Sequence, residues 1–144
     1  MRTKIGRNRV NGKRYEGEPV KELKQRGIYA RLGRSNEEYD ITLPELNINI
    51  ELKSTNRELS WCSTAVNKET VDQYNRLRRV PGNNYYGIRW KGKGIKGLRL
   101  YPISDIEKPP VLYRSEGITF EEFVFMLKSK MEQIKEKEDR EAVV

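Results

Sequence analysis

Charged side chains that could do chemistry together lie around Asp40 and Glu51, where charged and apolar residues alternate along the chain. Such alternation is typical of half-buried strands. It predicts a hairpin whose turn at 44–47 pairs Leu43 with Ile48. Counting back along both strands then places Asp40 directly opposite Glu51 on the polar face, while Leu43 and Ile48 face the core.

Two carboxylates that face each other on a sheet repel, and a bound divalent cation would remove the conflict. Hard oxygen ligands suit Mg²⁺, with Mn²⁺ as a substitute. Lys53 lies two residues beyond Glu51 and therefore projects from the same face. A lysine beside a metal-bound water can orient that water or stabilise negative charge on a phosphate under attack. The alternative is that Asp40, Glu51 and Lys53 form only the solvated face of an amphipathic hairpin, but paired acids are a poor choice for such a face.

The composition excludes several kinds of active site. The chain has no histidine, which rules out a serine–histidine–aspartate or cysteine–histidine relay and any zinc site built on histidine. Its single cysteine rules out a disulfide framework and a cysteine-built zinc site. Acid–base chemistry must therefore come from carboxylates, lysine, tyrosine or metal-bound water. No small-molecule cofactor is expected.

Positive charge is concentrated in two blocks. The net charge is +8, yet residues 1–14 hold six basic and no acidic side chains, and residues 76–99 hold eight basic and none acidic. Basic blocks on a mildly acidic body are typical of proteins that bind a polyanion, and we expect DNA held by its backbone phosphates. The alternative for either block is simply solvated charge. The expected phosphate contacts are Arg7, Arg9, Lys13, Arg14, Arg31, Arg34, Arg76, Arg79, Arg89, Lys91, Lys93 and Lys96.

Aromatic residues in the second basic block have two candidate uses. Tyr85, Tyr86 and Trp90 could stack on bases, but packing in the core is the stronger expectation. No helix-turn-helix or zinc-finger pattern is present in the sequence, so base-specific reading of DNA is not indicated.

The remaining pattern predicts helices and strands that alternate along the chain. An α/β fold, with a small mixed β-sheet flanked by helices, accounts for this order. We expect a single domain over residues 1–144, with a basic arm at 1–11 and a charged tail at 132–144. No apolar run approaches the ~20 residues of a membrane span and no signal-peptide pattern is present, so a cytoplasmic protein is expected. The expected elements are a helix from about Glu18 to Gly27, a strand at 28–32, the hairpin around 44–47, a helix from Asn67 to Pro81, a second hairpin formed by 85–90 and 98–103, and a helix that starts at the capping box Thr119–Glu122.

Ten residues separate Asp40 from the sequence Glu51-Leu52-Lys53. This spacing resembles the core of the PD-(D/E)xK nucleases. Within that superfamily, residues 12–128 resemble the archaeal Holliday junction resolvases. Further segments carry the same resemblance in chain order. They are the opening Gly12-Lys13-Arg14-Tyr15-Glu16, the polar loop with Ser35, the segment with Gln73, and the closing segment Gly117-Ile118-Thr119-Phe120-Glu121-Glu122-Phe123.

The resemblance implies a restriction-endonuclease-like nuclease core and assigns roles around a metal ion. Asp40 and Glu51 would ligate Mg²⁺, with the help of the Leu52 carbonyl. Lys53 would position or activate the attacking water. The family's helix glutamate falls on Glu16, which would assist at the same metal or at a second one.

The resemblance also implies roles away from the metal. Ser35 would contact the scissile phosphate or the metal, and Gln73 would orient Lys53 or the water. The substrate would be a four-way DNA junction, cut symmetrically by a homodimer with two active sites. Pro19 interrupts the first helix, so Glu18 is an alternative to Glu16 as the helix carboxylate.

Two other functions are open on the residues. Another nuclease with the same core could act on DNA ends, flaps or single strands. A non-catalytic basic DNA-binding protein would carry the same charge. In that last case Asp40→Asn or Lys53→Ala would change no activity, because none exists.

Overall fold

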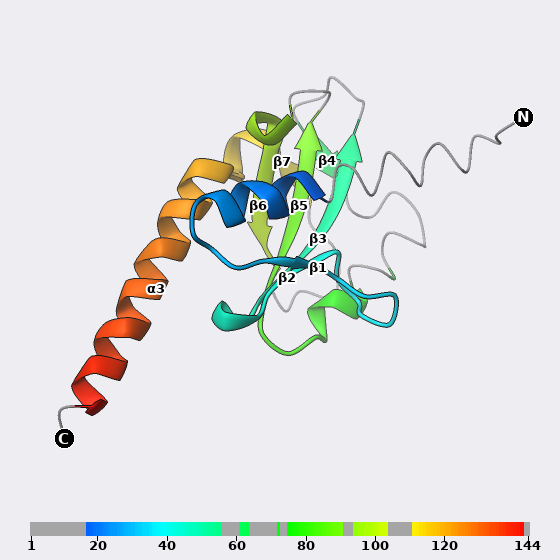
Figure 1. The fold of residues 1–144 in the computed structure, drawn as a ribbon. Helices are drawn as coiled ribbons and strands as arrows, with labels where there is room; N and C mark the ends of the chain where they lie inside the picture. Colours follow the sequence, from blue (N-terminus) through cyan, green and yellow to red (C-terminus); the bar gives the residue numbers. More distant parts are fainter. Residues whose placement is uncertain are drawn as a thin grey trace, which may run out of the picture.

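The computed structural model describes residues 17–55, 61–63, 72, 75–90, 94–103 and 111–142. Six strands form one sheet in the order β1-β2-β3-β5-β6-β8, and β4 pairs separately with β7 (Figure 1). The strands are β1 (Arg31–Leu32), β2 (Ile41–Leu43), β3 (Ile48–Thr55), β4 (Trp61–Ser63), β5 (Asn83–Trp90), β6 (Leu98–Pro102), β7 (Val111–Tyr113) and β8 (Ile118–Thr119). The helical segments are 17–25, 75–78 and α3 (Phe120–Ala142), with the short 3-10 turns η1 (Pro44–Leu46), η2 (Gly94–Gly97) and η3 (Arg114–Glu116).

The first hairpin has the predicted register over the whole of β2. Between its strands, η1 supplies the turn, and Asn47 closes it with a left-handed φ of 55°. Asparagine tolerates this conformation better than most residues. The cross-strand pairs are Ile41–Ile50, Thr42–Asn49 and Leu43–Ile48. Alternation of apolar and polar residues therefore predicted the pairing of this hairpin correctly.

The sheet is mixed because β3 and β5 run parallel, from the pair Ile48–Asn83 to the pair Thr55–Trp90. A parallel pair needs a crossover connection, and the helical residues 75–78 lie within it. β5 then pairs antiparallel with β6, which confirms the predicted second hairpin. The α/β fold with a small mixed sheet is confirmed.

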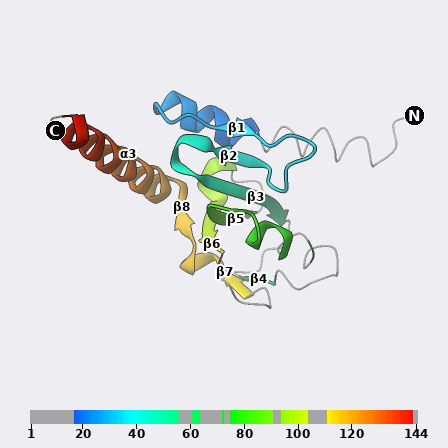
Figure 2. The same ribbon diagram turned by 90° about the horizontal axis from the view of Figure 1, so that it is seen from below.

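Helix 17–25 and α3 lie against the same face of the sheet (Figures 1 and 2). Leu23 and Phe123 are 1% and 0% exposed, and both belong to the apolar cluster that contains Ile50 and Tyr85. Because side chains alternate along a strand, Asn49, Glu51 and Lys53 of β3 must lie on the opposite face. This face is where the candidate site is found.

α3 begins where the capping box predicts, because the Glu122 amide donates a hydrogen bond of 3.1 Å to the Thr119 hydroxyl. The helix continues to Ala142. The segment predicted as a charged tail is therefore helical as far as the structure describes it, and its side chains from Glu132 to Ala142 are exposed. Figures 1 and 2 show this end of α3 pointing away from the sheet.

The strand predicted at 28–32 is shorter than expected, since β1 comprises Arg31–Leu32 alone. Ile28 and Ala30 are 1% and 0% exposed, so their apolar character reflects core packing and not strand pairing. The β4–β7 pair was not predicted, because it joins segments far apart in the sequence. Among the described helices, none combines the length and the apolar composition that a membrane span requires.

A buried polar network ties the sheet to the end of the helical segment 75–78. The Asn84 side-chain amide donates to the carbonyls of Leu77 at 3.0 Å and Val80 at 2.8 Å. Carbonyls at a helix end lack donors within the helix. The Asn84 oxygen accepts a hydrogen bond of 3.0 Å from the Asn49 amide. Asn84 therefore joins β5, β3 and the helix end on the face opposite α3.

Asn84→Ala is expected to lower the free energy of unfolding by about 1–3 kcal/mol, because the Val80 and Leu77 carbonyls and the Asn49 amide would each lose a hydrogen bond. Urea denaturation followed by circular dichroism measures this loss. Asn83→Ala is the matched control, since the Asn83 side chain is exposed, and we expect it to change the free energy of unfolding by less than about 0.5 kcal/mol. Equal losses in the two variants would contradict the structural role of the network.

Candidate active site

Asp40 lies in a bend immediately before β2, and its carboxylate is held against the backbone of β3. The Leu52 amide donates a hydrogen bond of 2.8 Å to Asp40 Oδ2. The Asp40 amide donates one of 3.0 Å to the Ile50 carbonyl. The regular ladder between β2 and β3 ends at the Ile41–Ile50 pair. Beyond that pair, the Asp40 carboxylate takes the place that a main-chain acceptor of β2 would otherwise occupy.

This arrangement corrects one detail of the predicted hairpin. The register predicts that Asp40 and Glu51 form the next cross-strand pair, but the ladder does not extend to them. Asp40 is joined to the residues on either side of Glu51 instead, through the Ile50 carbonyl and the Leu52 amide. Asp40 is therefore bound to the β3 backbone on both sides of Glu51 by hydrogen bonds, and the predicted pairing of the two acids does not form.

Glu51 and Lys53 project from β3 on the face opposite α3. They pair with Tyr86 and Ile88 of β5, and both of these residues belong to a second apolar cluster. Glu51 is 9% exposed. A carboxylate so largely buried beside apolar side chains needs compensating charge or hydrogen bonds.

The N–H and C=O of one strand residue point to the same neighbouring strand. Because the Leu52 N–H binds Asp40, the Leu52 carbonyl also points toward Asp40. The Asp40 carboxylate and the Leu52 carbonyl thus lie at the end of the hairpin, and Glu51 is the residue of β3 next to Leu52. Hard oxygen donors of this kind fit Mg²⁺ or Mn²⁺. Within the described ranges, no group of three histidine, cysteine or acidic residues gathers as a metal site. Glu16, the further acid expected at the metal, lies outside the described residues. A site with few protein ligands can still suit Mg²⁺, because this ion commonly keeps several of its waters.

The loop at 33–39, just before Asp40, is organised around Glu37, which the sequence pattern did not single out. The Arg31 guanidinium donates to both oxygens of Glu37, at 2.7 and 3.1 Å. The Arg34 amide donates to it at 2.8 Å, and the Tyr39 hydroxyl donates as well. No local spacing rule links Arg31 to Glu37, so the sequence contained no signal for this cluster.

These hydrogen bonds shift the ionisation of the cluster. The Arg31 guanidinium, followed by the Tyr39 hydroxyl and the Arg34 amide, holds the pKa of Glu37 well below its usual range. The Glu37 carboxylate in turn raises the pKa of Tyr39. Because the pKa of Glu37 is lowered by folding, its ionised carboxylate stabilises the folded chain at pH values above the ordinary glutamate pKa of about 4.3. This stabilisation is lost as the pH falls below that value.

No family profile and no curated protein sequence matches the chain. Comparison with solved structures finds a Holliday junction resolvase from the archaeal hyperthermophile Archaeoglobus fulgidus, with a TM-score of 0.54 and 20% sequence identity. The match covers 79% of this chain and 95% of that one. This chain shares the fold of that resolvase. The likeness agrees with the resemblance found in the sequence and with the predicted α/β core.

The described basic residues that were predicted to contact DNA differ in their exposure and in their partners. Arg34, Arg79 and Lys96 are exposed. Arg31 is bound to Glu37, and Arg76 lies 3.2 Å from Glu38. Six further residues that were predicted to contact phosphates lie outside the described residues, namely Arg7, Arg9, Lys13, Arg14, Lys91 and Lys93. The predicted site residues Glu16 and Gln73 also lie outside the described residues.

Arg89 is a correction to the predicted DNA-binding surface. It is 5% exposed, and its guanidinium lies 3.3 Å from the Glu18 carboxylate. An arginine enclosed in this way between β5 and helix 17–25 does not present its charge to a phosphate. The same contact engages Glu18, the alternative helix carboxylate, in an ion pair. The aromatic residues of this strand, Tyr86 and Trp90, are each 2% exposed, and Tyr85 is 7% exposed, which confirms core packing.

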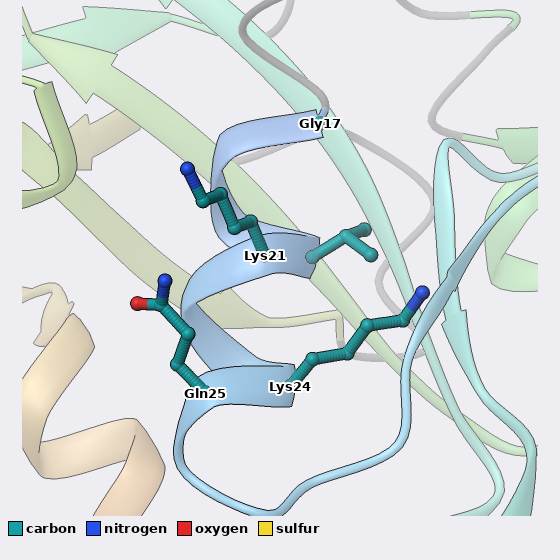
Figure 3. A pocket seen from close by; sticks show the side chains of 5 residues that line it. Gly17, Lys21, Lys24 and Gln25 are labelled. Carbon is teal, nitrogen blue, oxygen red and sulfur yellow. The ribbon is translucent and has the colours of Figure 1, made fainter.

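The other predicted positions differ in exposure. Ser35 is exposed in the loop before Asp40, and Lys53 is half-buried. A surface hollow of about 490 Å³ runs along helix 17–25, lined by Gly17, Val20, Lys21, Lys24 and Gln25 (Figure 3). None of these lining residues carries a carboxylate, so the hollow is distinct from the candidate site.

Proposed function

We propose that this chain is a metal-dependent endonuclease that cuts branched DNA, with the four-way junction as its substrate. The observation that carries the proposal is the hydrogen bond of 2.8 Å between the Leu52 amide and the Asp40 carboxylate. This bond holds the Asp40 carboxylate against the backbone of Leu52, the residue between Glu51 and Lys53 in β3. The arrangement supplies two acids, a carbonyl and a lysine on neighbouring backbone positions.

Asp40, Glu51 and the Leu52 carbonyl would hold Mg²⁺, and Mn²⁺ would substitute for it. When bound, the metal would supply Lewis-acid stabilisation of the charge on the phosphate. Lys53 would orient the attacking water and offset negative charge as the phosphodiester bond breaks. Glu16 would assist at the metal, Ser35 would contact the scissile phosphate, and Gln73 would orient Lys53.

Charge and fold support DNA as the substrate. The net charge is +8, and Arg34 is exposed in the loop that leads into Asp40. Contacts from such cations to phosphates position DNA without reading its sequence. The likeness in fold to a Holliday junction resolvase favours recognition of branched shape. A homodimer with two active sites would cut such a junction symmetrically.

Cleavage is expected only for the junction and only with Mg²⁺. The purified chain is incubated with end-labelled four-way junction, linear duplex, flap or single strand, each with Mg²⁺ and with EDTA, and the products are separated on denaturing gels. Symmetric nicks in the junction alone support the proposal. Cutting of flaps, ends or single strands would indicate another nuclease with the same core. Tight binding without any cleavage in Mg²⁺ would show a non-catalytic DNA-binding protein.

A further inference from the structure

The loop at 33–39 is closed through a single carboxylate. Glu37 accepts hydrogen bonds from Arg31, in β1 just before the loop, and from the Tyr39 hydroxyl, at the end of the loop. It also accepts one of 2.8 Å from the Arg34 amide. The Glu37 side chain is 18% exposed. Exposed ion pairs usually contribute little, but this carboxylate is shielded and joins two residues of the loop, Arg34 and Tyr39, to Arg31 of β1.

The base of the loop is closed by direct backbone contact. The Gly33 amide donates a hydrogen bond of 2.7 Å to the Asp40 carbonyl. A Cβ at Gly33 would lie 1.9 Å from the Tyr39 carbonyl oxygen, so only glycine allows the two ends of the loop to approach so closely. The loop and Asp40 therefore form one connected unit.

The position of the Asp40 carboxylate depends on this unit. Asp40 is bound on three sides, through its carbonyl to Gly33, its amide to Ile50 and its carboxylate to Leu52. Tyr39 is its direct neighbour in the chain and is held by Glu37. A loop that opens at Glu37 would free Tyr39, and the backbone at Asp40 would move with it.

We propose that Glu37 is a positioning residue, which keeps the loop at 33–39 closed so that the Asp40 carboxylate stays against the Leu52 amide. The catalytic consequence rests on the proposed nuclease function. Glu37 itself does not touch the metal or the DNA. It acts through Tyr39 and Gly33 on Asp40, and it keeps Ser35 on the same closed loop.

Glu37→Gln tests this role, because glutamine keeps the size of the side chain but loses the charge that binds Arg31. Hydrogen exchange of the Leu52 amide, measured by NMR, is expected to accelerate about tenfold or more. The Mg²⁺ concentration needed for half-maximal junction cleavage is expected to rise by about 10-fold to 100-fold, the usual cost of losing a residue that orients a metal ligand. The Kd for junction DNA in EDTA is expected to stay unchanged.

Glu38→Gln is the matched control, since Glu38 is the next residue of the loop and loses the same charge. The Glu38 side chain is 53% exposed, and its carboxylate forms an ion pair of 3.2 Å with the half-exposed Arg76. We expect Leu52 exchange and the Mg²⁺ requirement to match the unsubstituted chain. If Glu37→Gln does not fold, Tyr39→Phe removes one hydrogen bond to Glu37 and should shift both measurements in the same direction.

Unchanged Leu52 exchange in Glu37→Gln would overturn the proposal, and so would a loss of DNA binding without any change in the Mg²⁺ requirement. The exchange measurement needs neither metal nor DNA. If the unsubstituted chain cuts no DNA, while Glu37→Gln still accelerates Leu52 exchange, the proposed function fails and the positioning of Asp40 by Glu37 stands.

Discussion

Asp40→Asn is expected to lower the rate constant of Mg²⁺-dependent junction cleavage on the order of 10³-fold or more, because a metal ion contributes several kcal/mol of transition-state stabilisation that a neutral amide would hold poorly. The fold should survive, since the asparagine oxygen can still accept the hydrogen bond from the Leu52 amide, which is 2.8 Å long in the native chain. Loss of cleavage with retention of fold and binding is therefore the expected result.

Single-turnover cleavage, junction binding in EDTA and calorimetric titration with Mn²⁺ separate these effects. Asp139→Asn is the matched control, because it makes the same chemical change at an exposed position near the end of α3. We expect that control to cleave and to bind Mn²⁺ like the unsubstituted chain. A cleavage rate in Asp40→Asn within about tenfold of the original would show that Asp40 does not hold the metal.

Phe123→Ala is expected to lower the free energy of unfolding by about 3–5 kcal/mol, the usual loss when a buried aromatic side chain leaves a cavity. Phe123 is 0% exposed, and its ring meets Tyr85 edge-on with the centroids 5.2 Å apart. This contact joins α3 to β5, so its loss weakens the attachment of α3 to the sheet. Urea denaturation followed by tryptophan fluorescence and circular dichroism measures the effect.

Phe125→Ala provides the comparison within the same helix. Phe125 is 76% exposed, so its removal should change the free energy of unfolding by less than about 0.5 kcal/mol. Similar losses in the two variants would indicate that α3 is not held on the sheet by Phe123. A large loss in Phe125→Ala alone would mean that the outer face of α3 is buried in solution.

The sequence by itself determined the parts of the fold that depend on local patterns. Alternation around a four-residue turn predicted the Ile41–Ile50 and Leu43–Ile48 pairs correctly, because a shift of one residue would turn every apolar side chain out of the core. The Thr119 cap was equally local, since a helix start needs a side-chain acceptor within three residues.

Long-range partners were decided only by the tertiary structure. The parallel pairing of β3 with β5 joins strands separated by a crossover, and the burial of Arg89 against Glu18 joins segments that no sequence rule connects. Local spacing describes which face a residue occupies but not which distant segment packs there.

The candidate site shows the same division. Alternation is sufficient to place Glu51 and Lys53 on one face of β3, whereas Asp40 lies just beyond the ladder at the end of this hairpin. How Asp40 is held there, by the Leu52 amide and by a loop closed through Glu37, was decided by the tertiary structure. The reason is physical: hydrogen-bond partners of side chains are chosen by distances of a few ångströms in the folded chain, which alternation alone does not specify.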